Sequence, residues 1–387
     1  MVMISIFENK LRSELICPYC MRVFPLKEFY FCTKCGENFA KIRFGKMICG
    51  VQNCEGGVNP EFIVKCPFTK SESESICGED IPQAVLDAPY FSFSIVGVPS
   101  SGKSNFITVM LKELENISSS GLQLAVSPIN TKASDIQNEN SRIIFKDHKR
   151  LPPTDKTQPP PQIWQLKNRQ RMEKDFCPTY TFTIFDGAGE HSIGRANESV
   201  TRYISTSEAI IITIDPLTLD NVRGKIDSKV LNNSQAYEGA SATKALQFIT
   251  DELLRKSLKI GSGVRLDIPV AVVLTKFDVI LDEKNESFGR YLGKDAKSRI
   301  KKTKIEDGKV NISEMQSVSK DIRDFLLKLE EGNFVYTVEG NFKNMMFFGV
   351  SSYGKPPIDS DTLDGDITPQ GVLDPILWLL HLKKFID

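Results

Sequence analysis

The sequence predicts an α/β protein in which a mainly parallel sheet flanked by helices follows small cysteine-rich domains. Two observations carry this prediction. From Pro89 onward, β-rich runs alternate with amphipathic helical patterns, which is the order of elements in an α/β domain. Eight of the nine cysteines precede residue 80, partly as C-x-x-C pairs, and the 387 residues are enough for two or three domains.

The composition argues against several classes of protein. The formal net charge is zero, so no global field attracts the chain to nucleic acid or to an anionic membrane. The longest apolar runs, such as 268–277 and 375–380, are too short to span a bilayer. The first 15 residues lack the basic and apolar regions of a secretory signal. Clustered cysteines without an export signal favour metal binding over disulfides, so we expect a cytoplasmic protein.

Hydrophobic periodicity places the elements of the α/β domain. Strands are expected at 91–96, 180–185, 209–214, 270–274 and 345–350, with a weaker candidate at 163–166. Helices are expected at 103–117, 242–259, 313–331 and 375–385. The polar stretch 130–162, which ends in a run of prolines, is interpreted as irregular. The polar stretches 216–239 and 282–308 are interpreted as loops or short inserted elements.

Residues 97–104 read GVPSSGKS, a complete G-x-x-x-x-G-K-S phosphate-binding loop. A β-rich run precedes it and a helical pattern follows it, so backbone N–H groups and a helix N-terminus would face a phosphate chain. Lys103 would reach the β- and γ-phosphates, and Ser104 would ligate Mg²⁺. The residues expected to contact nucleotide here are Gly97, Ser100, Ser101, Gly102, Lys103, Ser104 and Asn105.

Two more motifs follow the ends of predicted strands. D-x-x-G runs from Asp186 to Gly189, where the carboxylate can hold a magnesium-bound water and the glycine N–H can approach a γ-phosphate. T-K-x-D runs from Thr275 to Asp278. Asp278 can accept hydrogen bonds from N1–H and the exocyclic amine of guanine, a donor pair that adenine lacks. Lys276 can lay its apolar stem along the base.

A fourth motif, Ser351 and Ser352, ends the last predicted strand, where a backbone N–H can contact guanine O6. With these motifs in order at strand ends, residues 88–387 resemble a P-loop GTPase of the translation-factor and Ras-like class. The segments 210–220 and 369–380 resemble GTPase domains of bacterial conflict or stress operons. The resemblance implies GTP or GDP and Mg²⁺ at one edge of the sheet, and slow GTP hydrolysis without a partner, since no internal arginine finger is identifiable.

The resemblance also implies catalytic roles for residues outside the phosphate-binding loop. Asp186 and Gly189 belong to the second switch, and Asp186 serves Mg²⁺. A first-switch threonine should also ligate Mg²⁺; Thr157 is preferred, and Thr154 remains an alternative. Glu190 stands where many members have a water-orienting glutamine or histidine. An ionised glutamate is unfavourable beside a γ-phosphate, so Glu190 either points away or orients water with help from a cation.

Two further details concern residues near these motifs. Thr275 replaces the more usual asparagine, which some GTPases of this class tolerate. Arg195 and Arg202 follow the D-x-x-G motif, and a surface or structural role is favoured for each. Asp215 ends a predicted strand and is interpreted as a cap.

The cysteines predict two zinc sites in the first 80 residues. Cys17, Cys20, Cys32 and Cys35 form two C-x-x-C pairs, and four such thiolates complete a closed tetrahedral site, so residues 1–46 are predicted to be a zinc ribbon. The remaining set, Cys49, Cys54, Cys66 and Cys77, repeats the interval of eleven residues and predicts a second zinc-binding module and linker at 47–80.

Charge favours a protein partner for the cysteine-rich region. Residues 1–80 contain ten Lys and Arg against ten Asp and Glu. Eight thiolates and two zinc ions would leave a net charge of about −4, which suits phosphates poorly. Nucleic acid remains an alternative, because aromatic residues there could stack on bases.

The main hypothesis is therefore a GTP-dependent switch with a zinc module for docking, in a bacterial defence or stress system. One alternative is a P-loop ATPase that uses Asp186 or Asp215 with Mg²⁺. Another is a non-hydrolysing nucleotide-bound scaffold whose zinc module binds protein or nucleic acid. The oligomeric state and the pathway are left open.

Overall fold

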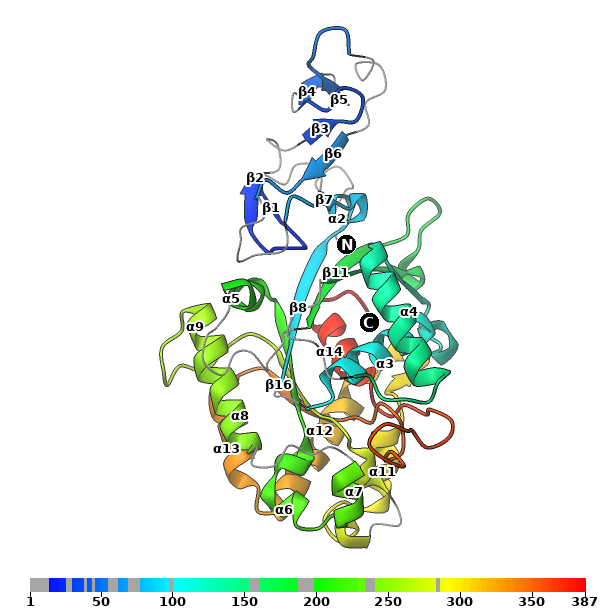
Figure 1. Ribbon diagram of the computed structural model, residues 1–387, viewed down its shortest axis with the longest axis vertical. Helices are drawn as coiled ribbons and strands as arrows, with labels where there is room; N and C mark the ends of the chain where they lie inside the picture. The colour runs from blue at the N-terminus through cyan, green and yellow to red at the C-terminus, as the bar shows by residue number, and fades with distance from the viewer. Residues whose placement is uncertain are drawn as a thin grey trace.

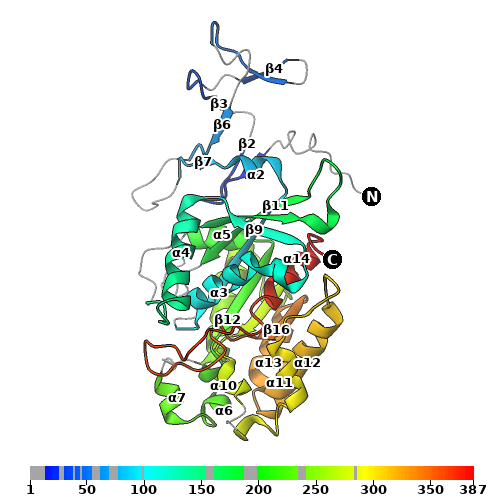
Figure 2. The same ribbon diagram turned by 90° about the vertical axis from the view of Figure 1, so that its right-hand side faces the viewer.

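A cysteine-rich head stands at one end of a larger α/β body (Figures 1 and 2). This computed structural model describes residues 14–25, 30–37, 40–43, 46–54, 62–68, 77–97, 100–152, 161–186, 198–233, 241–282 and 286–387. Among them, no helix is long and apolar enough to cross a bilayer.

Short antiparallel pairings build the head. β1 pairs with β2, β4 with β5, and β6 lies between β3 and β7. The bounds are β1 Glu14–Ile16, β2 Val23–Pro25, β3 Tyr30–Cys32, β4 Ala40–Arg43, β5 Lys46–Cys49, β6 Phe62–Lys65 and β7 Asp80–Ile81. Helix α2 (Gln83–Asp87) then leads into the body.

The body contains a mainly parallel sheet, as predicted. Within the described residues the strand order is β16-β13-β12-β8-β11-β10-β9. The first five are parallel, and β10 runs antiparallel to both β11 and β9. The bounds are β8 Tyr90–Gly97, β9 Leu124–Pro128, β10 Gln162–Asn168, β11 Thr179–Asp186, β12 Ala209–Ile214, β13 Val270–Leu274 and β16 Met345–Gly349.

Both faces of the sheet are buried, which explains the continuous apolar runs of its central strands. Ile210, Ile212 and Ile214 of β12 enter one core, while Ala209 and Ile211 enter the other. α5, α8 and α13 contribute to the first core, and α3 and α14 to the second. The main helices are α3 Lys103–Glu115, α4 Thr131–Phe145, α5 Glu198–Thr206, α8 Ala242–Phe248, α11 Lys294–Lys301, α12 Ile312–Lys328, α13 Gly332–Asn341 and α14 Asp374–Leu382.

Short elements complete the body. The predicted helix at 242–259 is α8, a π-helix at Ile249–Arg255 and α9 (Lys256–Leu258). The stretches predicted as loops or short inserted elements carry α6 (Asp220–Arg223), α7 (Ser228–Asn233), α11 and β14 (Ile305–Glu306). β14 pairs with β15 (Lys309–Val310), which follows the second stretch. α10 (Asp278–Leu281) follows β13 directly.

The prediction of an irregular segment at 130–162 is wrong for its first half, which forms α4. This helix packs on α3 partly through polar groups, so its apolar periodicity is weak. The Gln137 amide donates to the Thr108 carbonyl at 3.0 Å, and the Asn140 amide donates to the Thr108 hydroxyl at 3.3 Å. β9 and α13 were also not foreseen. The proline-rich residues 153–160 lie outside the described part of the chain.

Candidate functional site

The phosphate-binding loop lies at the carboxyl end of β8, the middle strand of the seven-stranded sheet. β8 ends at Gly97 and α3 begins at Lys103. A Cβ atom on Gly97 would lie 2.0 Å from the Thr213 hydroxyl oxygen and 2.7 Å from that of Ser101. Only glycine fits between β8 and the end of β12. The sequence motif and the packing thus require the same residue.

We expect Gly97→Ala to lower the free energy of unfolding by about 1–3 kcal/mol, because the new methyl group forces apart buried atoms. Chemical denaturation of the two proteins would measure this difference. Gly340→Ala is the matched control: a Cβ there meets nothing within 4 Å on α13. Alanine in a helix should be neutral or stabilising. Equal unfolding energies for wild type and Gly97→Ala would contradict the packing.

The loop has the backbone bends that a phosphate cradle needs. Ser100 and Gly102 have φ angles of 60° and 76°, in the left-handed region. Ser101 is buried, and its hydroxyl lies 3.0 Å from that of Thr213. Asn105, on the first turn of α3, accepts a hydrogen bond from the Leu151 backbone N–H at 3.3 Å. This contact ties the phosphate loop to the segment that precedes the predicted first switch.

Thr275 joins the phosphate loop to the T-K-x-D motif. Its hydroxyl donates to the Ser101 carbonyl at 2.6 Å, and the Thr275 side chain is buried. A threonine can thus span the two loops here, which explains its presence where asparagine is more usual in the resembled class. The two loops follow β13 and β8, which lie on either side of β12 in the parallel part of the sheet. Both loops therefore lie at the carboxyl ends of the parallel strands.

Lys276 is held by Asp215, the last residue before a 3-10 turn. Its ammonium lies 2.6 Å from the Asp215 carboxylate, which is 2% exposed. Asp215 also accepts the Leu217 backbone N–H at 2.9 Å, so the prediction that it caps this turn is confirmed. With a φ of 48°, the backbone of Lys276 turns sharply beside Gly102, where a Cβ would lie 4.0 Å from Lys276 Cε.

Asp278 and Ser351 lie together where β13 and β16 end. Both are buried, and burial raises the pKa of Asp278, while a hydrogen bond to the Ser351 side chain opposes this shift. The Ser351 hydroxyl also accepts the Gly354 N–H at 2.8 Å. Ser352 follows in the same turn and is half-buried. The buried carboxylate is thus fixed in a serine-lined site at the edge that carries the phosphate loop.

Sequence reasoning missed Arg150, which lies near this carboxylate. Its positive charge favours the ionised form of Asp278, and burial lowers the pKa of Arg150 itself. Its Nε and the Tyr353 hydroxyl are buried and have no hydrogen-bond partner among the described residues. The backbone N–H of Arg150 donates to Asp361 at 2.9 Å. No motif marks this arginine, because its proximity to Asp278 arises only from the tertiary fold.

The switch residues are not brought together in the described part of the chain. Asp186 ends β11, and nothing is described of its side chain. Thr157, Thr154, Gly189 and Glu190 lie outside the described residues. Their predicted roles therefore stay predictions.

All eight cysteines of the head fall into two four-sulfur clusters that could hold metal ions, but the predicted grouping is wrong. The outer cluster contains Cys17, Cys20, Cys66 and Cys77, and the inner cluster contains Cys32, Cys35, Cys49 and Cys54. The inner cluster is therefore nested within the outer one. A division at residues 46 and 47 cuts through both clusters and does not separate two metal modules.

Strand pairing explains the nested grouping. β6 runs antiparallel to β3, with Cys32 opposite Phe62. The chain thereby returns to the turn that carries Cys17 and Cys20. β7 then folds onto β6, so that Cys77 lies 2.8 Å from Cys66. Equal spacings of eleven residues hid this connectivity in the sequence.

The sulfur positions fit tetrahedral zinc. A tetrahedron with Zn–S bonds of about 2.3 Å has edges of about 3.8 Å. The Cys17–Cys77, Cys20–Cys66 and Cys35–Cys49 sulfurs lie 3.7 Å apart, and the Cys32–Cys54 sulfurs 3.8 Å apart. In each cluster all four sulfurs lie within 4.8 Å of one another. The Cys66–Cys77 sulfurs are closer, at 2.8 Å.

Electrostatics also favours a cation in both clusters. Backbone N–H groups of Cys35 and Lys34 lower the pKa of Cys32 to about 7, so this thiol is prepared to ionise. Burial raises the pKa of Cys17, because a buried thiolate without a countercharge is costly. Hydrogen bonds from the neighbouring thiols, Cys17 first, lower the pKa of Cys66. A divalent cation would supply the missing charge.

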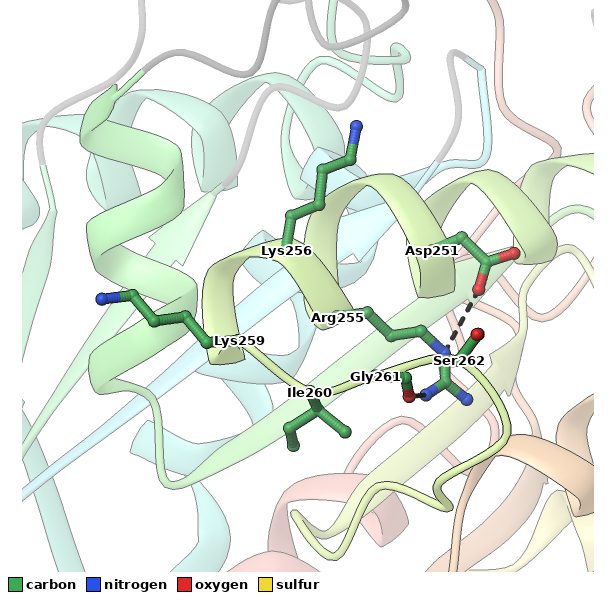
Figure 3. A pocket seen from close by; sticks show the side chains of 7 residues that line it. All are labelled: Asp251, Arg255, Lys256, Lys259, Ile260, Gly261 and Ser262. Carbon is green, nitrogen blue, oxygen red and sulfur yellow. Dashed lines mark hydrogen bonds and ion pairs between the residues drawn. The ribbon is translucent and has the colours of Figure 1, made fainter.

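A pocket is lined by residues within 251–262, which include the end of the π-helix, α9 and the start of the loop that follows (Figure 3). Its arginine has a structural role. Arg255, which lines the pocket, is 7% exposed and donates to the carbonyls of Gly261 and Val264 at 2.6 and 2.8 Å. It also donates to the Asn341 side chain at 2.7 Å and pairs with Asp251 at 3.2 Å. The guanidinium of Arg255 is therefore occupied by partners within the protein. Its bonds to the Gly261 and Val264 carbonyls fix the loop before β13.

Replacing this arginine should destabilise the fold. Arg255→Ala removes the buried guanidinium and its hydrogen bonds to the Gly261 and Val264 carbonyls and to Asn341, and we expect a loss of about 1–3 kcal/mol in the free energy of unfolding. Lys256→Ala, one residue on, removes an exposed side chain that pairs with Glu252 and should change it by less than about 0.5 kcal/mol. Thermal unfolding of both variants measures the contrast. Similar losses would contradict this role of Arg255.

Comparisons with known proteins place the chain only broadly. No protein-family model matches it. It is 21% identical over 318 residues to a putative ESX-1 scaffolding and assembly protein, SaeC, of Mycolicibacterium smegmatis, covering 79% of this chain and 78% of that protein.

Two solved GTPase-related structures also match. The sup35 structure complexed with GDP has a TM-score of 0.27 and 10% identity, over 75% of this chain and 41% of that one. The S. cerevisiae Ski7 GTPase-like domain, bound to GDP and inorganic phosphate, has a TM-score of 0.26 and 15% identity, over 68% of this chain and 43% of that one. The chain thus spans less than half the length of either. At these values neither structure bears on the function of this chain.

Proposed function

We propose that this chain is a magnesium-dependent GTP-binding switch that hydrolyses GTP slowly by itself and docks a protein partner. The observation that carries the proposal is the joined pair of loops at one sheet edge. Thr275 bonds the phosphate loop to the T-K-x-D motif, and Asp278 lies buried against Ser351. The proposed phosphate site and the proposed guanine-reading carboxylate would then lie beside each other.

The residues of this edge suit GTP and GDP chemically. Asp278 would accept hydrogen bonds from N1–H and the exocyclic amine of guanine. The stem of Lys276, fixed by Asp215, would cover the base. Gly102 opens α3, whose N-terminal N–H groups would face the phosphates together with Lys103. Ser351 and Ser352 would border the base.

Magnesium, when bound, would neutralise charge on the β- and γ-phosphates. Ser104, Thr157 and Asp186 are the residues proposed to hold it. Glu190, next to Gly189 of the second switch, is proposed to orient water or to point away. Arg150 lies near Asp278, and its positive charge would help to keep that carboxylate ionised for contact with guanine.

The head is proposed to be a zinc-binding docking module. The relative from Mycolicibacterium smegmatis is called a scaffolding and assembly protein, and assembly would require protein contacts. The low charge of the head agrees with a protein partner. Eight reduced thiols suit the cytoplasm. A place in a bacterial defence or stress system is supported by the resemblance alone.

Isothermal titration of the zinc-replete protein with GTP, GDP and ATP in magnesium tests the nucleotide site. We expect selective binding of GTP and GDP, weakened by roughly tenfold or more in Lys103→Ala, which removes a charge-assisted contact to phosphate. Stronger binding of ATP would support the ATPase alternative instead. No binding to any of the three by folded protein would overturn the proposal. Persistence of bound GTP in single-turnover assays would favour the scaffold alternative.

A further inference from the structure

The turn that carries the first two outer-cluster cysteines is seated on the body. Met21, which follows Cys20, is 3% exposed and belongs to the same apolar core as Phe185 and Tyr203. The Tyr90 hydroxyl, at the start of β8, donates to the Met21 sulfur at 3.6 Å. The residue that follows a cysteine of the outer cluster is therefore packed in the body core.

Helix α5 satisfies backbone carbonyls of this same turn. The Tyr203 hydroxyl donates to the carbonyl of Tyr19, and Arg202 Nε donates to the carbonyl of Cys20 at 3.3 Å. Burial raises the pKa of Tyr203, so it remains a neutral donor. Arg202 thus has the structural role that the sequence favoured.

The ring of Tyr203 also touches the strand that leads into the second switch. It stacks on Phe185 with ring centroids 3.6 Å apart and planes 3° apart. Phe185 immediately precedes Asp186, where D-x-x-G begins, and α5 opens at Glu198, after that motif. One tyrosine therefore contacts both the metal-ligand turn and the strand before the switch. Figure 1 shows α5 between the head and the body strands.

We propose that the outer cysteine cluster is coupled to the second switch through α5, so that metal occupancy and nucleotide state influence each other. This coupling rests on the proposed guanine-nucleotide site. Four thiolates on one metal fix the turn, and the fixed turn supports α5 in its described position. The proposed γ-phosphate contacts of the second switch begin at Asp186, next to Phe185, which stacks on Tyr203 of α5, whereas GDP has no γ-phosphate to contact. GTP therefore binds the metal-loaded protein better than the metal-free protein, and GDP distinguishes them less.

Reciprocity makes the coupling measurable from the metal side. If metal in the outer cluster favours GTP binding, GTP must hold that metal more tightly by the same factor. The full-length, zinc-loaded protein is brought to equilibrium with a series of chelator concentrations and a colorimetric zinc indicator, in saturating GDP or in saturating non-hydrolysable GTP analogue. We expect the analogue to lower the apparent dissociation constant of one zinc by about tenfold, within the usual range of coupling between sites. The second zinc should have the same dissociation constant with either nucleotide.

Two variants assign the effect. Cys32→Ser/Cys35→Ser removes the inner cluster, so the nucleotide-sensitive zinc should remain. Tyr203→Phe keeps the ring stack but loses the hydroxyl that donates to Tyr19, and should reduce the ratio of the zinc dissociation constants in GDP and in the GTP analogue toward one. Tyr336→Phe is the matched control, since its side chain is 60% exposed on α13. The wild-type comparison needs no substitution, so it stands if a variant fails to fold.

The possible results distinguish failure of this coupling from failure of the proposed guanine-nucleotide binding. Binding of both nucleotides with equal zinc dissociation constants would overturn the coupling alone. Nucleotide sensitivity that disappears with the inner cluster would assign it to the wrong metal and overturn the coupling through α5. No binding of GTP or GDP, measured by titration, would overturn the proposed function and the coupling together.

Discussion

Asp278→Asn is expected to convert the protein from binding GTP to binding XTP. The buried carboxylate would accept two donors of guanine, and asparagine can accept only one of them while presenting its amide hydrogens to the other. Two charge-assisted hydrogen bonds are worth roughly 3–6 kcal/mol together, so GTP affinity should fall by about 10²–10⁴-fold. Xanthine carries a carbonyl in place of the amine, and the new amide can donate to it.

Titration of wild type and Asp278→Asn with GTP and XTP measures both sides of this exchange. Gain of XTP binding shows that the variant is folded and that the site survives, which a simple loss could not show. Asp282→Asn is a control: Asp282 follows α10 and is not proposed to contact nucleotide. Unchanged GTP affinity in Asp278→Asn would exclude this carboxylate as the base-reading group.

The same carboxylate gives opposite pH dependences to binding and stability. Because burial raises the pKa of Asp278 above its ordinary value of 3.8, the folded protein takes up this proton at a higher pH than the unfolded chain. Protonation removes an acceptor, so GTP affinity should fall as the pH drops through the raised pKa. Between the pKa values of the unfolded and folded states, the native protein binds more protons at Asp278 than the unfolded chain does. Over this range the free energy of unfolding of the nucleotide-free protein should therefore rise as the pH falls.

The elements that sequence analysis located well are those whose surroundings are simple. β12 and β13 are buried on both faces, so each forms an uninterrupted apolar run whose limits match the prediction. The phosphate loop carries its own backbone requirements at Gly97 and Gly102. α4 was missed because its contact with α3 is partly polar, through Gln137 and Asn140.

Tertiary proximity explains what could not be predicted in the candidate site. Arg150 and Asp278 are 128 positions apart, and only the fold brings their charges near each other. The cysteines show the same limit more sharply. Their residue type predicted clusters that could hold metal, but equal spacings allowed more than one grouping, and the pairing of β3 with β6 decides between them.

That grouping can be tested by two crossed double substitutions in which each loses two cysteines. Cys17→Ser/Cys66→Ser removes two of the four ligands of the outer cluster and none of the inner one, so it should leave one zinc per chain, held by the inner cluster. Cys17→Ser/Cys32→Ser removes one ligand from each cluster and should weaken both sites. Grouping in chain order predicts the reverse. Zinc content after dialysis against a moderate chelator, measured by atomic emission, distinguishes the two.

The expected effect is large because a closed four-thiolate site contributes on the order of 10–16 kcal/mol of apparent binding energy to the fold around it. Loss of the outer site should therefore release the turn that Tyr203 and Arg202 hold, while the inner site, formed by ligands between residues 32 and 54, keeps its metal. Loss of one ligand in each site leaves two weakened centres, and both should empty. Retention of one zinc by Cys17→Ser/Cys32→Ser, with none in Cys17→Ser/Cys66→Ser, would reverse the nested arrangement and remove the basis for linking the outer cluster to α5.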